Sequence, residues 1–487
     1  MGAGALARVY PPAVAAQPAS GAPAAGARRA PLVRSTASQR PIAAIAVVAA
    51  MIAGGLLARD VKVGLVLVGA CGFATLVLID VPLAVAAWVP IAWIEYSHVA
   101  GKAPVVATVV LLLGWIATRK ARGKSLRVGA EDRTAMLAIG LLLVWLTLSM
   151  AWASERSLAW AEAKSWYAAA AAFFLIANAM ASPRNVRILV VAFVVGALVS
   201  ILVGLSGHGG LTTNADALDL ATRQRFAGGL GDPIYPAAGL VAAIALAAGL
   251  LPSMRDPIAR LGLVASIVAL AAALAATESR GGLIGALVAI IAAVVLARRQ
   301  RLQAAAFGVC AIAAVAAFFL ASPSALHRVT SFNAGGDGRA ELWKVGWRMT
   351  EDHPVTGVGL AAFQTEAKNY VREPGSLQFV RLIVDEPHVT HNVYLQQLAE
   401  TGVVGLALLL AVIGASLGAA ARAARRFDAL GDPALATLAR AVIIASIGFL
   451  TASLFISNST DKRLWIILAL GPALLGAAHR VSSSTER

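Results

Sequence analysis

The sequence is poor in charged residues for its length. Only 14% of its 487 residues are Asp, Glu, Lys or Arg, while 59% are hydrophobic, and the mean hydropathy is +0.77. In an average soluble domain about one quarter of the residues are charged, and a water-soluble core cannot enclose this much apolar surface. The composition therefore excludes an ordinary soluble domain and predicts a membrane protein.

Cysteine and metal-binding patterns are scarce as well. The two cysteines, Cys71 and Cys310, fall in apolar runs, where cysteine acts as a small apolar side chain, and they give no disulfide framework. The sequence has no HExxH motif, no DxD pair, and no His, Cys or Asp spacing typical of a metal site. Its glycine pairs lack the lysine and strand context of a phosphate-binding loop. We expect no metal, nucleotide or other cofactor.

Acidic residues are fewer than basic ones, and the formal net charge is +16. The basic residues are dispersed between apolar runs and are not gathered into a domain with stacking aromatic residues, which argues against nucleic-acid binding. Residues 1–40 are rich in Ala, Pro and Gly and contain no continuous apolar stretch that ends in a cleavage site. We interpret them as a disordered tail and not as a signal peptide.

Long apolar runs fill most of the remaining chain. A spanning helix needs about 20 apolar residues, and this length predicts an all-α polytopic membrane protein with about 12 to 14 spans. The runs lie near 41–57, 61–79, 81–97, 104–118, 135–153, 165–182, 186–206, 234–252, 260–277, 281–297, 302–321, 402–421, 436–456 and 464–479. They form a bundle at 41–321 and a second group at 402–479, separated by the segment 322–401, and a short tail follows at 480–487.

The distribution of Lys and Arg predicts the orientation. With a cytoplasmic N-terminus the inner segments hold about 23 of these residues, against roughly 10 in the short outer loops. Both termini are therefore expected in the cytoplasm. The long segment 322–401 then lies outside the membrane on the periplasmic side, together with the loop 207–233 and the turn TESRGG at 277–282.

The segment 322–401 has the composition of an ordered loop, and loops of this length are usually functional or disordered. It contains aromatic residues and a helix-like stretch, RAELWKVGWRMT, between the possible N-cap Asp337 and the breaker Pro354. Arg339, Trp343 and Trp347 would share one face of that helix. The next stretch, GVGLAAF, predicts a turn that leads into another short helix.

One histidine and several arginines are the candidates for chemistry. His391 is expected on one helical face with Leu395 and Leu398, just before the span at 402, where the helix dipole favours a neutral ring that can accept a proton. The alternative is a surface histidine that packs beside leucines. Arg225, Arg280 and Arg339 lie at predicted outer positions; they could simply reach toward the headgroups, but planar guanidinium groups also bind a diphosphate in bidentate fashion.

Four stretches resemble, in order, the signatures of the O-antigen ligase and polymerase superfamily of bacterial envelope glycosyltransferases. They are RFAGGLGDPIYPAAGL, TESRGGLIGALVAI, GRAELWKVGWRMTEDHPVTGVGLAAF and THNVYLQQLAETGVVGL, and together they cover about residues 220–425. The first departs from the family pattern, which commonly has Asn where this chain has Ile234. The set is specific as an ordered series, whereas each stretch alone is not.

The resemblance implies a metal-independent enzyme with a GT-C-like fold in the bacterial inner membrane. Such an enzyme transfers a glycan from undecaprenyl diphosphate to an acceptor hydroxyl, with lipid A-core or another glycan as the acceptor and membrane lipids as its surroundings. By matching positions, Arg280 and Arg339 would bind the diphosphate, Arg225 would be a third contact, and His391 would activate the acceptor. A single displacement would invert the anomeric centre.

Three other interpretations remain open from the sequence. A polymerase that joins lipid-linked repeat units shares the SRGG and HNxYL signatures, and the spacing between Arg348 and Gly359 is similar to a polymerase pattern. A transporter of lipid-linked oligosaccharides would also suit fourteen spans, but charges inside its spans would be expected. A structural membrane protein would require neither His391 nor Arg339.

Overall fold

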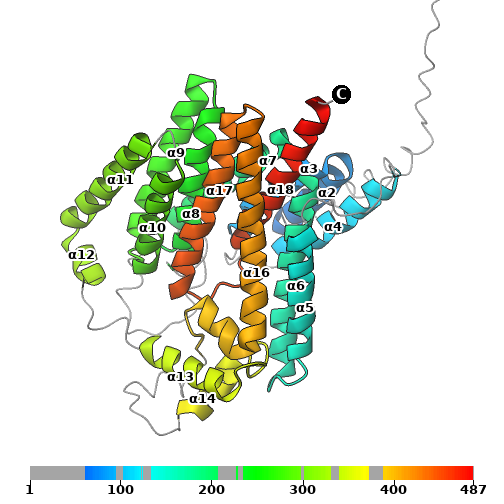
Figure 1. The fold of residues 1–487 in the computed structure, drawn as a ribbon, viewed down its shortest axis with the longest axis vertical. Helices are drawn as coiled ribbons and strands as arrows, with labels where there is room; N and C mark the ends of the chain where they lie inside the picture. Colours follow the sequence, from blue (N-terminus) through cyan, green and yellow to red (C-terminus); the bar gives the residue numbers. More distant parts are fainter. Residues whose placement is uncertain are drawn as a thin grey trace, which may run out of the picture. The chain divides into compact units, whose positions relative to one another are not determined.

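The computed structural model is helical throughout the part of the chain that it describes, and no strand occurs there (Figure 1). The described residues are 61–94, 103–121, 123, 133–206, 226–228, 234–297, 301–330, 339–371 and 388–485. The chain divides into two compact units, residues 1–71 and 72–487. Most of the first unit lies outside the described residues, so the architecture below is that of the second.

The helices before the long loop segment are α2 (Val61–Ile79), α3 (Val81–Ala92), α4 (Ala103–Ala121), α5 (Arg133–Ser149), α6 (Arg156–Ala179), α7 (Pro183–Leu205), α8 (Ile234–Leu250), η4 (Leu251–Ser253), α9 (Pro257–Ala276), α10 (Arg280–Leu296) and α11 (Arg301–Ala321). Those that follow are α12 (Pro323–Thr330), α13 (Arg339–Asp352), α14 (Phe363–Val371), α16 (Val393–Ala429), α17 (Pro433–Ala452), η6 (Ser453–Phe455) and α18 (Lys462–Thr485).

Every predicted span from 61–79 onward corresponds to one of these helices, and the predicted span 41–57 lies outside the described residues. Six of the described helices are long and apolar enough to cross a membrane, and further apolar helices are shorter. The prediction of an all-α polytopic membrane protein is therefore confirmed.

Local sequence signals set several helix starts. The helices α7, α9 and α17 each begin with proline directly after a capping residue, namely Ser182, Asp256 and Asp432. Each capping side chain accepts a hydrogen bond from the backbone N–H three residues later. Proline suits the first helical position because its missing N–H would have no partner there. These caps fix where one span ends and the next begins.

The centre of the second unit consists of α8, α10, α16, α17 and α18. α17 packs against α8 and α10, and α16 packs against α17 and α18. The buried residues of α8 are mostly alanine and glycine, and such small side chains allow neighbouring membrane helices to approach closely. On the outside, Leu137, Leu141, Val144 and Leu148 of α5 are each more than half exposed, as expected of a stripe that faces lipid.

α16 is longer than a single span requires. Its 37 residues would extend about 55 Å at 1.5 Å per residue, whereas the hydrocarbon core of a bilayer is about 30 Å thick. The helix bends at Gly402, where φ is 68°, and this is where the sequence predicts that the span begins. The turns before Gly402 pack against α13 and α14 and belong with the loop segment (Figure 1).

Candidate functional site

Arg280 occupies the first position of α10. The preceding turn is very short: Thr277 ends α9, Glu278 has a φ of 50°, and Ser279 caps α10 by accepting a hydrogen bond from the N–H of Gly282 at 3.2 Å. The start of a helix carries partial positive charge and unpaired N–H groups, which favour a bound anion. The positive charge of Arg280 and the partial positive charge of the helix start therefore both favour a bound anion.

Gly281 allows the start of α10 to approach η6. A β-carbon at this position would lie 2.9 Å from the Cβ of Phe455, which is closer than real β-carbons approach one another. Phe455 in turn faces Trp343 of α13, and the two ring centroids are 6.5 Å apart. Phe455 thus contacts both the start of α10, within the TESRGG turn, and Trp343 of α13.

Arg339 is the first residue of α13, as predicted, whereas the expected cap Asp337 lies outside the described residues. One turn later the indole N–H of Trp343 donates a hydrogen bond to the carbonyl oxygen of Thr390 at 2.9 Å. Below it Val345 and Met349 are fully buried in a small core shared with α14. α13 is therefore held at Trp343 against the segment that carries His391 and, further along, against α14.

His391 lies just before α16 and not within it. The cap of α16 is Asn392, whose side chain accepts hydrogen bonds from the N–H groups of Tyr394 and Leu395 at 3.0 and 3.1 Å. His391 itself has a φ of 51°, the left-handed conformation that non-glycine residues rarely adopt. The prediction that it shares a helical face with Leu395 and Leu398 is wrong, because the asparagine starts the helix one residue later.

Thr390 fixes this bend. Its side chain is fully buried, its hydroxyl donates to the carbonyl of Asn392 at 2.8 Å, and it accepts from the N–H of the same residue at 3.2 Å. The hydroxyl also lies 3.4 Å from that of Ser457, whose carbonyl oxygen accepts a hydrogen bond from Tyr235 of α8 at 3.3 Å. The bend that carries His391 is thus held by Trp343 of α13 and by Ser457, which in turn accepts a hydrogen bond from α8.

We call the contacting residues Gly281, Trp343, Thr390, Phe455 and Ser457 the loop junction. They come from α10, α13, the bend before α16, η6 and the residues just after η6. Arg280, Arg339 and His391 each lie within four residues of a junction member. The chain segments that carry the three predicted functional residues therefore meet in one contact cluster, although they are far apart in the sequence.

Arg225, the third predicted diphosphate contact, lies outside the described residues. The N–H of its neighbour Phe226 donates to the carbonyl of Ala276 at 3.1 Å, at the end of α9. The first signature is thereby tied to the TESRGG turn, which begins at the next residue.

The loop between α13 and α14 is joined to the bend in α16. Val403 donates its N–H to the carbonyl of Pro354, Gly359 donates to that of Glu400, and Val358 donates to that of Ala399, all at 2.8 to 2.9 Å. The α14 start at Phe363 confirms the turn and short helix predicted for GVGLAAF. These bonds make the loop helices and the first turns of α16 one structural body.

Arg348 and Gly359, whose spacing is similar to a polymerase pattern, have structural roles in the body formed by the loop helices and the first turns of α16. Arg348 donates to the carbonyl of Tyr370 at the end of α14 at 2.8 Å. At Gly359, where φ is 111°, a β-carbon would lie 2.5 Å from the Cα of Ala153. The spacing is therefore explained by packing of the loop, and it does not distinguish a polymerase from a ligase.

Sequence reasoning missed the buried ion pair between Asp461 and Arg463, which lies after η6 at the start of α18. Arg463 is 1% exposed and Asp461 is 8% exposed, and the carboxylate accepts hydrogen bonds from the backbone N–H and the Nε of Arg463 at 2.9 Å. The guanidinium also lies 5.1 Å from the ring of Trp93 at the end of α3. The pair braces the segment between η6 and α18; the run DKR beside an apolar stretch was the available signal.

Among the described residues, no group of three or more His, Cys, Asp or Glu side chains lies close enough to hold a metal ion. Charged groups beside the loop junction include the arginines at the starts of α10 and α13 and the ion pair between Glu341 and Lys344 of α13. Such a set can bind phosphate oxygens, and a histidine beside it can accept a proton.

Comparison with known proteins finds a family match over this part of the chain. Residues 264–410 match the family model described as O-antigen ligase, and this range includes Arg280, Arg339 and His391. No curated protein matches the sequence well enough to count as a relative. The family match confirms, over residues 264–410, the resemblance to the O-antigen ligase and polymerase superfamily that was drawn from the sequence.

Proposed function

We propose that this protein transfers a glycan from undecaprenyl diphosphate to an acceptor hydroxyl of lipid A-core, without a metal ion. The observation that carries the proposal is the loop junction, which gathers two helix starts with arginine at their first positions and the strained bend that presents His391. In this proposal the junction faces the periplasm, the protein lies in the bacterial inner membrane, and both termini are cytoplasmic.

The donor diphosphate would lie at the starts of α10 and α13. Arg280 and Arg339 would each bind phosphate oxygens, and the N–H groups at the start of α10 would add to the positive potential. Arg225 is the proposed third contact. As the bond between the anomeric carbon and the phosphate oxygen breaks, the leaving diphosphate gains negative charge, and fixed cationic donors stabilise that charge in the transition state.

His391 would act on the acceptor. The acceptor oxygen attacks the anomeric carbon from the face opposite to the diphosphate, the hydroxyl proton passes to the imidazole, and undecaprenyl diphosphate departs with the electron pair of the broken bond. This single displacement inverts the anomeric centre. General-base assistance of this kind contributes about 10²- to 10⁴-fold in rate. The left-handed backbone at His391 supports this role, because strained conformations cluster at functional sites.

The first test is transfer in vitro. The purified full-length protein would be incubated with undecaprenyl-diphosphate glycan and lipid A-core in EDTA, and product would be measured for the wild type, His391→Ala, Arg339→Ala and Arg280→Ala. We expect wild-type transfer in EDTA and a loss of at least about 100-fold in each variant. His353→Ala is a matched control, because His353 is exposed at the end of α13, and it should retain full activity.

The same assay separates the other candidates. Elongation of the lipid-linked glycan without modification of lipid A-core would identify a polymerase, and the ligase assignment would be wrong. Activity that EDTA abolishes would contradict a metal-independent mechanism. Absence of transfer to any acceptor, with transport of the lipid-linked glycan across a vesicle membrane, would instead support a transporter.

A further inference from the structure

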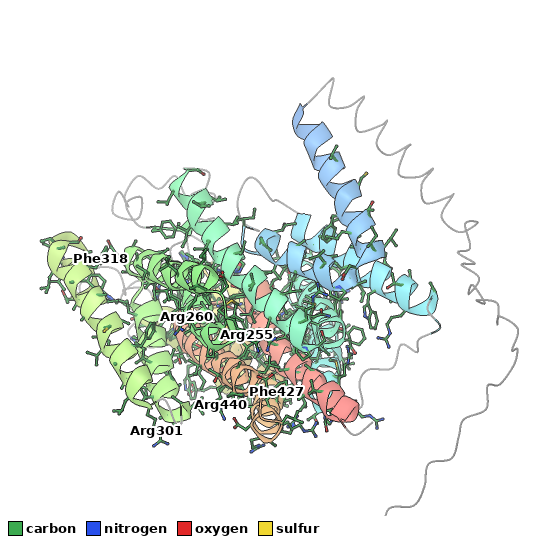
Figure 2. All side chains as sticks on the ribbon, turned by 90° about the horizontal axis from the view of Figure 1, so that it is seen from above. Arg255, Arg260, Arg301, Phe318, Phe427 and Arg440 are labelled. Carbon is green, nitrogen blue, oxygen red and sulfur yellow. The ribbon has the colours of Figure 1, made fainter. Side chains whose placement is uncertain are left out.

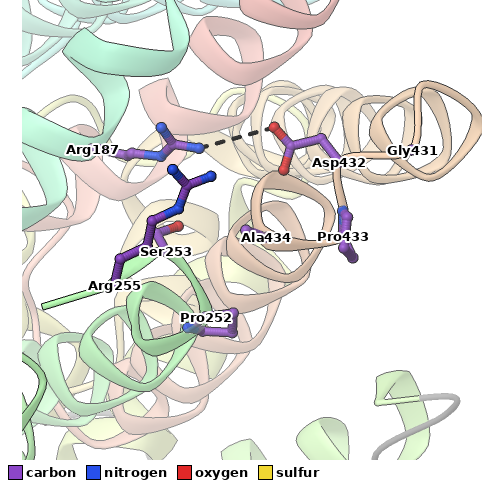
Figure 3. Close-up of a pocket in the computed structure, with 8 residues that line it drawn as sticks. All are labelled: Arg187, Pro252, Ser253, Arg255, Gly431, Asp432, Pro433 and Ala434. Carbon is purple, nitrogen blue, oxygen red and sulfur yellow. Dashed lines mark ion pairs between the residues drawn. The ribbon is translucent and has the colours of Figure 1, made fainter. Parts of the chain in front are cut away.

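A basic pocket lies at the end of the second unit that is opposite to the loop junction. The course of α7 shows that the pocket and the loop junction lie at opposite ends. Gly204, near the C-terminal end of α7, packs against Phe226 and Gly228 beside the TESRGG turn. Arg187, which lines the pocket, lies in the second turn of the same helix. The pocket has a volume of about 600 Å³ and is lined by Arg187, Pro252, Ser253, Arg255, Gly431, Asp432, Pro433 and Ala434 (Figure 3).

Two guanidinium groups dominate this pocket. Arg187 and Arg255 extend into it side by side, and a dashed line in Figure 3 marks the ion pair between Arg187 and Asp432, at 3.9 Å. Asp432 balances only one of these positive charges. Two donor atoms at the pocket, Nε of Arg187 and Oγ of Ser253, are buried and have no hydrogen-bond partner. The pocket therefore offers one uncompensated positive charge and unused donors, which suit a phosphate group.

The surroundings of the pocket favour a lipid as the source of that phosphate. Directly after Arg255, the first turns of α9 carry Ile258 and Leu261, which are 79% and 70% exposed. In a membrane protein such a face lies against acyl chains. Figure 2 labels two further arginines near Arg255, namely Arg260 of α9 and Arg440 of α17, and Arg440 forms an ion pair with Asp428. The pocket thus opens where a basic rim meets an apolar face.

We propose that this pocket binds the headgroup of an anionic phospholipid, with the phosphodiester between Arg187 and Arg255 and the acyl chains along the exposed face of α9. Basic pockets between membrane helices recognise headgroups of this class through the same chemistry. The proposal is independent of the glycosyl transfer at the other end. Headgroup binding would join α7, which carries Arg187, to the segment after η4, which carries Arg255.

The test measures thermal unfolding of the purified full-length protein in a neutral detergent by tryptophan fluorescence. The probes are short-chain phosphatidylglycerol, short-chain phosphatidylcholine and inorganic phosphate, because a ligand that binds only the folded state raises Tm with its concentration. We expect a saturable rise in Tm with phosphatidylglycerol alone. Arg255→Gln should weaken its apparent affinity about fivefold, whereas Arg260→Gln, which removes a nearby arginine outside the pocket lining, should leave it unchanged.

A second variant guards against a folding defect. Arg187→Gln combined with Asp432→Asn removes the ion pair from both sides, and asparagine still caps α17; this variant should also lose affinity for phosphatidylglycerol. An equal response of wild type and Arg255→Gln would overturn the proposal. An equal response to phosphatidylcholine would show that acyl chains alone bind. A saturable response to inorganic phosphate would show a soluble-anion site and would likewise overturn the lipid assignment.

Discussion

At the scale of single residues, Glu400 is a buried acidic residue that the proposed mechanism does not use. It is 5% exposed and accepts hydrogen bonds from the N–H of Ala361 and the side chain of Gln396 at 3.1 and 3.2 Å. It precedes the bend at Gly402, in the segment that we place outside the membrane. Burial, and secondarily the nearby carboxylate of Glu162, raises the pKa of Glu400 to about 8.

This raised pKa predicts a stability that depends on pH. The folded protein holds the Glu400 proton more tightly than the unfolded chain, where the pKa is near 4.5. The stability that the proton contributes is therefore complete below about pH 4.5 and is lost as the pH rises through about 8. We expect the wild-type Tm to fall between pH 6 and 9, and Glu400→Gln to show a smaller fall.

Thermal unfolding across that pH range would check the prediction, with Glu351→Gln, an exposed position on α13, as the control. A pH dependence in Glu400→Gln equal to that of the wild type would assign the effect to other groups. Sequence reasoning did not single out Glu400. The role of Glu400 depends on its contact with residue 361. Contacts between residues that are distant in the sequence cannot be predicted from the periodicity of hydrophobic residues.

At the scale of elements, the bend in α16 depends on one glycine. At Gly402, where φ is 68°, a β-carbon would lie 2.0 Å from the carbonyl oxygen of Val355, and this atom belongs to a backbone that cannot move away easily. The N–H of the next residue, Val403, bonds to the carbonyl of Pro354. The glycine thus joins the span to the loop body that carries α13 and α14.

Gly402→Ala should therefore destabilise the protein by about 2 to 4 kcal/mol, from backbone strain and overpacking together. It should also lower glycan transfer, because α13 would lose its fixed place beside the loop junction. Gly414→Ala is the matched control: it lies in the same helix, nothing approaches its missing β-carbon within 4 Å, and alanine there should be neutral or stabilise by up to about 1 kcal/mol. Similar Tm losses for both variants would contradict this view of the bend.

Helix positions were largely predictable from the sequence, and the relations between helices were not. Apolar runs of the right length located the spans, and RAELWKVGWRMT located α13 from its apolar face and its breaker. The backbone at His391 was not predictable, because an asparagine cap and a left-handed histidine give the same pattern of residue types as a helix that begins two residues earlier, at His391. The buried pair of Asp461 and Arg463 was missed because burial of a charge depends on Trp93, which is distant in the sequence.

At the scale of the whole molecule, the two ends of the helical bundle have different chemistry. The loop junction, with Arg280, Arg339 and His391, lies at one end, and the pocket between Arg187 and Arg255 lies at the other. A glycan acceptor carried outside the cytoplasm and a lipid-linked donor can meet only at the outer face. The proposed function therefore requires that the loop junction is periplasmic and that the arginine pocket is cytoplasmic.

Cysteine accessibility tests this orientation. In a background in which Cys71 and Cys310 are replaced by serine, His353→Cys would place one thiol on the loop body, and Arg425→Cys would place one near the far end of α16; both positions are exposed. We expect a membrane-impermeant maleimide to label His353→Cys in intact spheroplasts and Arg425→Cys only after lysis. The reverse pattern would put Arg280, Arg339 and His391 in the cytoplasm. It would thereby rule out transfer to a periplasmic acceptor, even if purified protein catalysed transfer in solution.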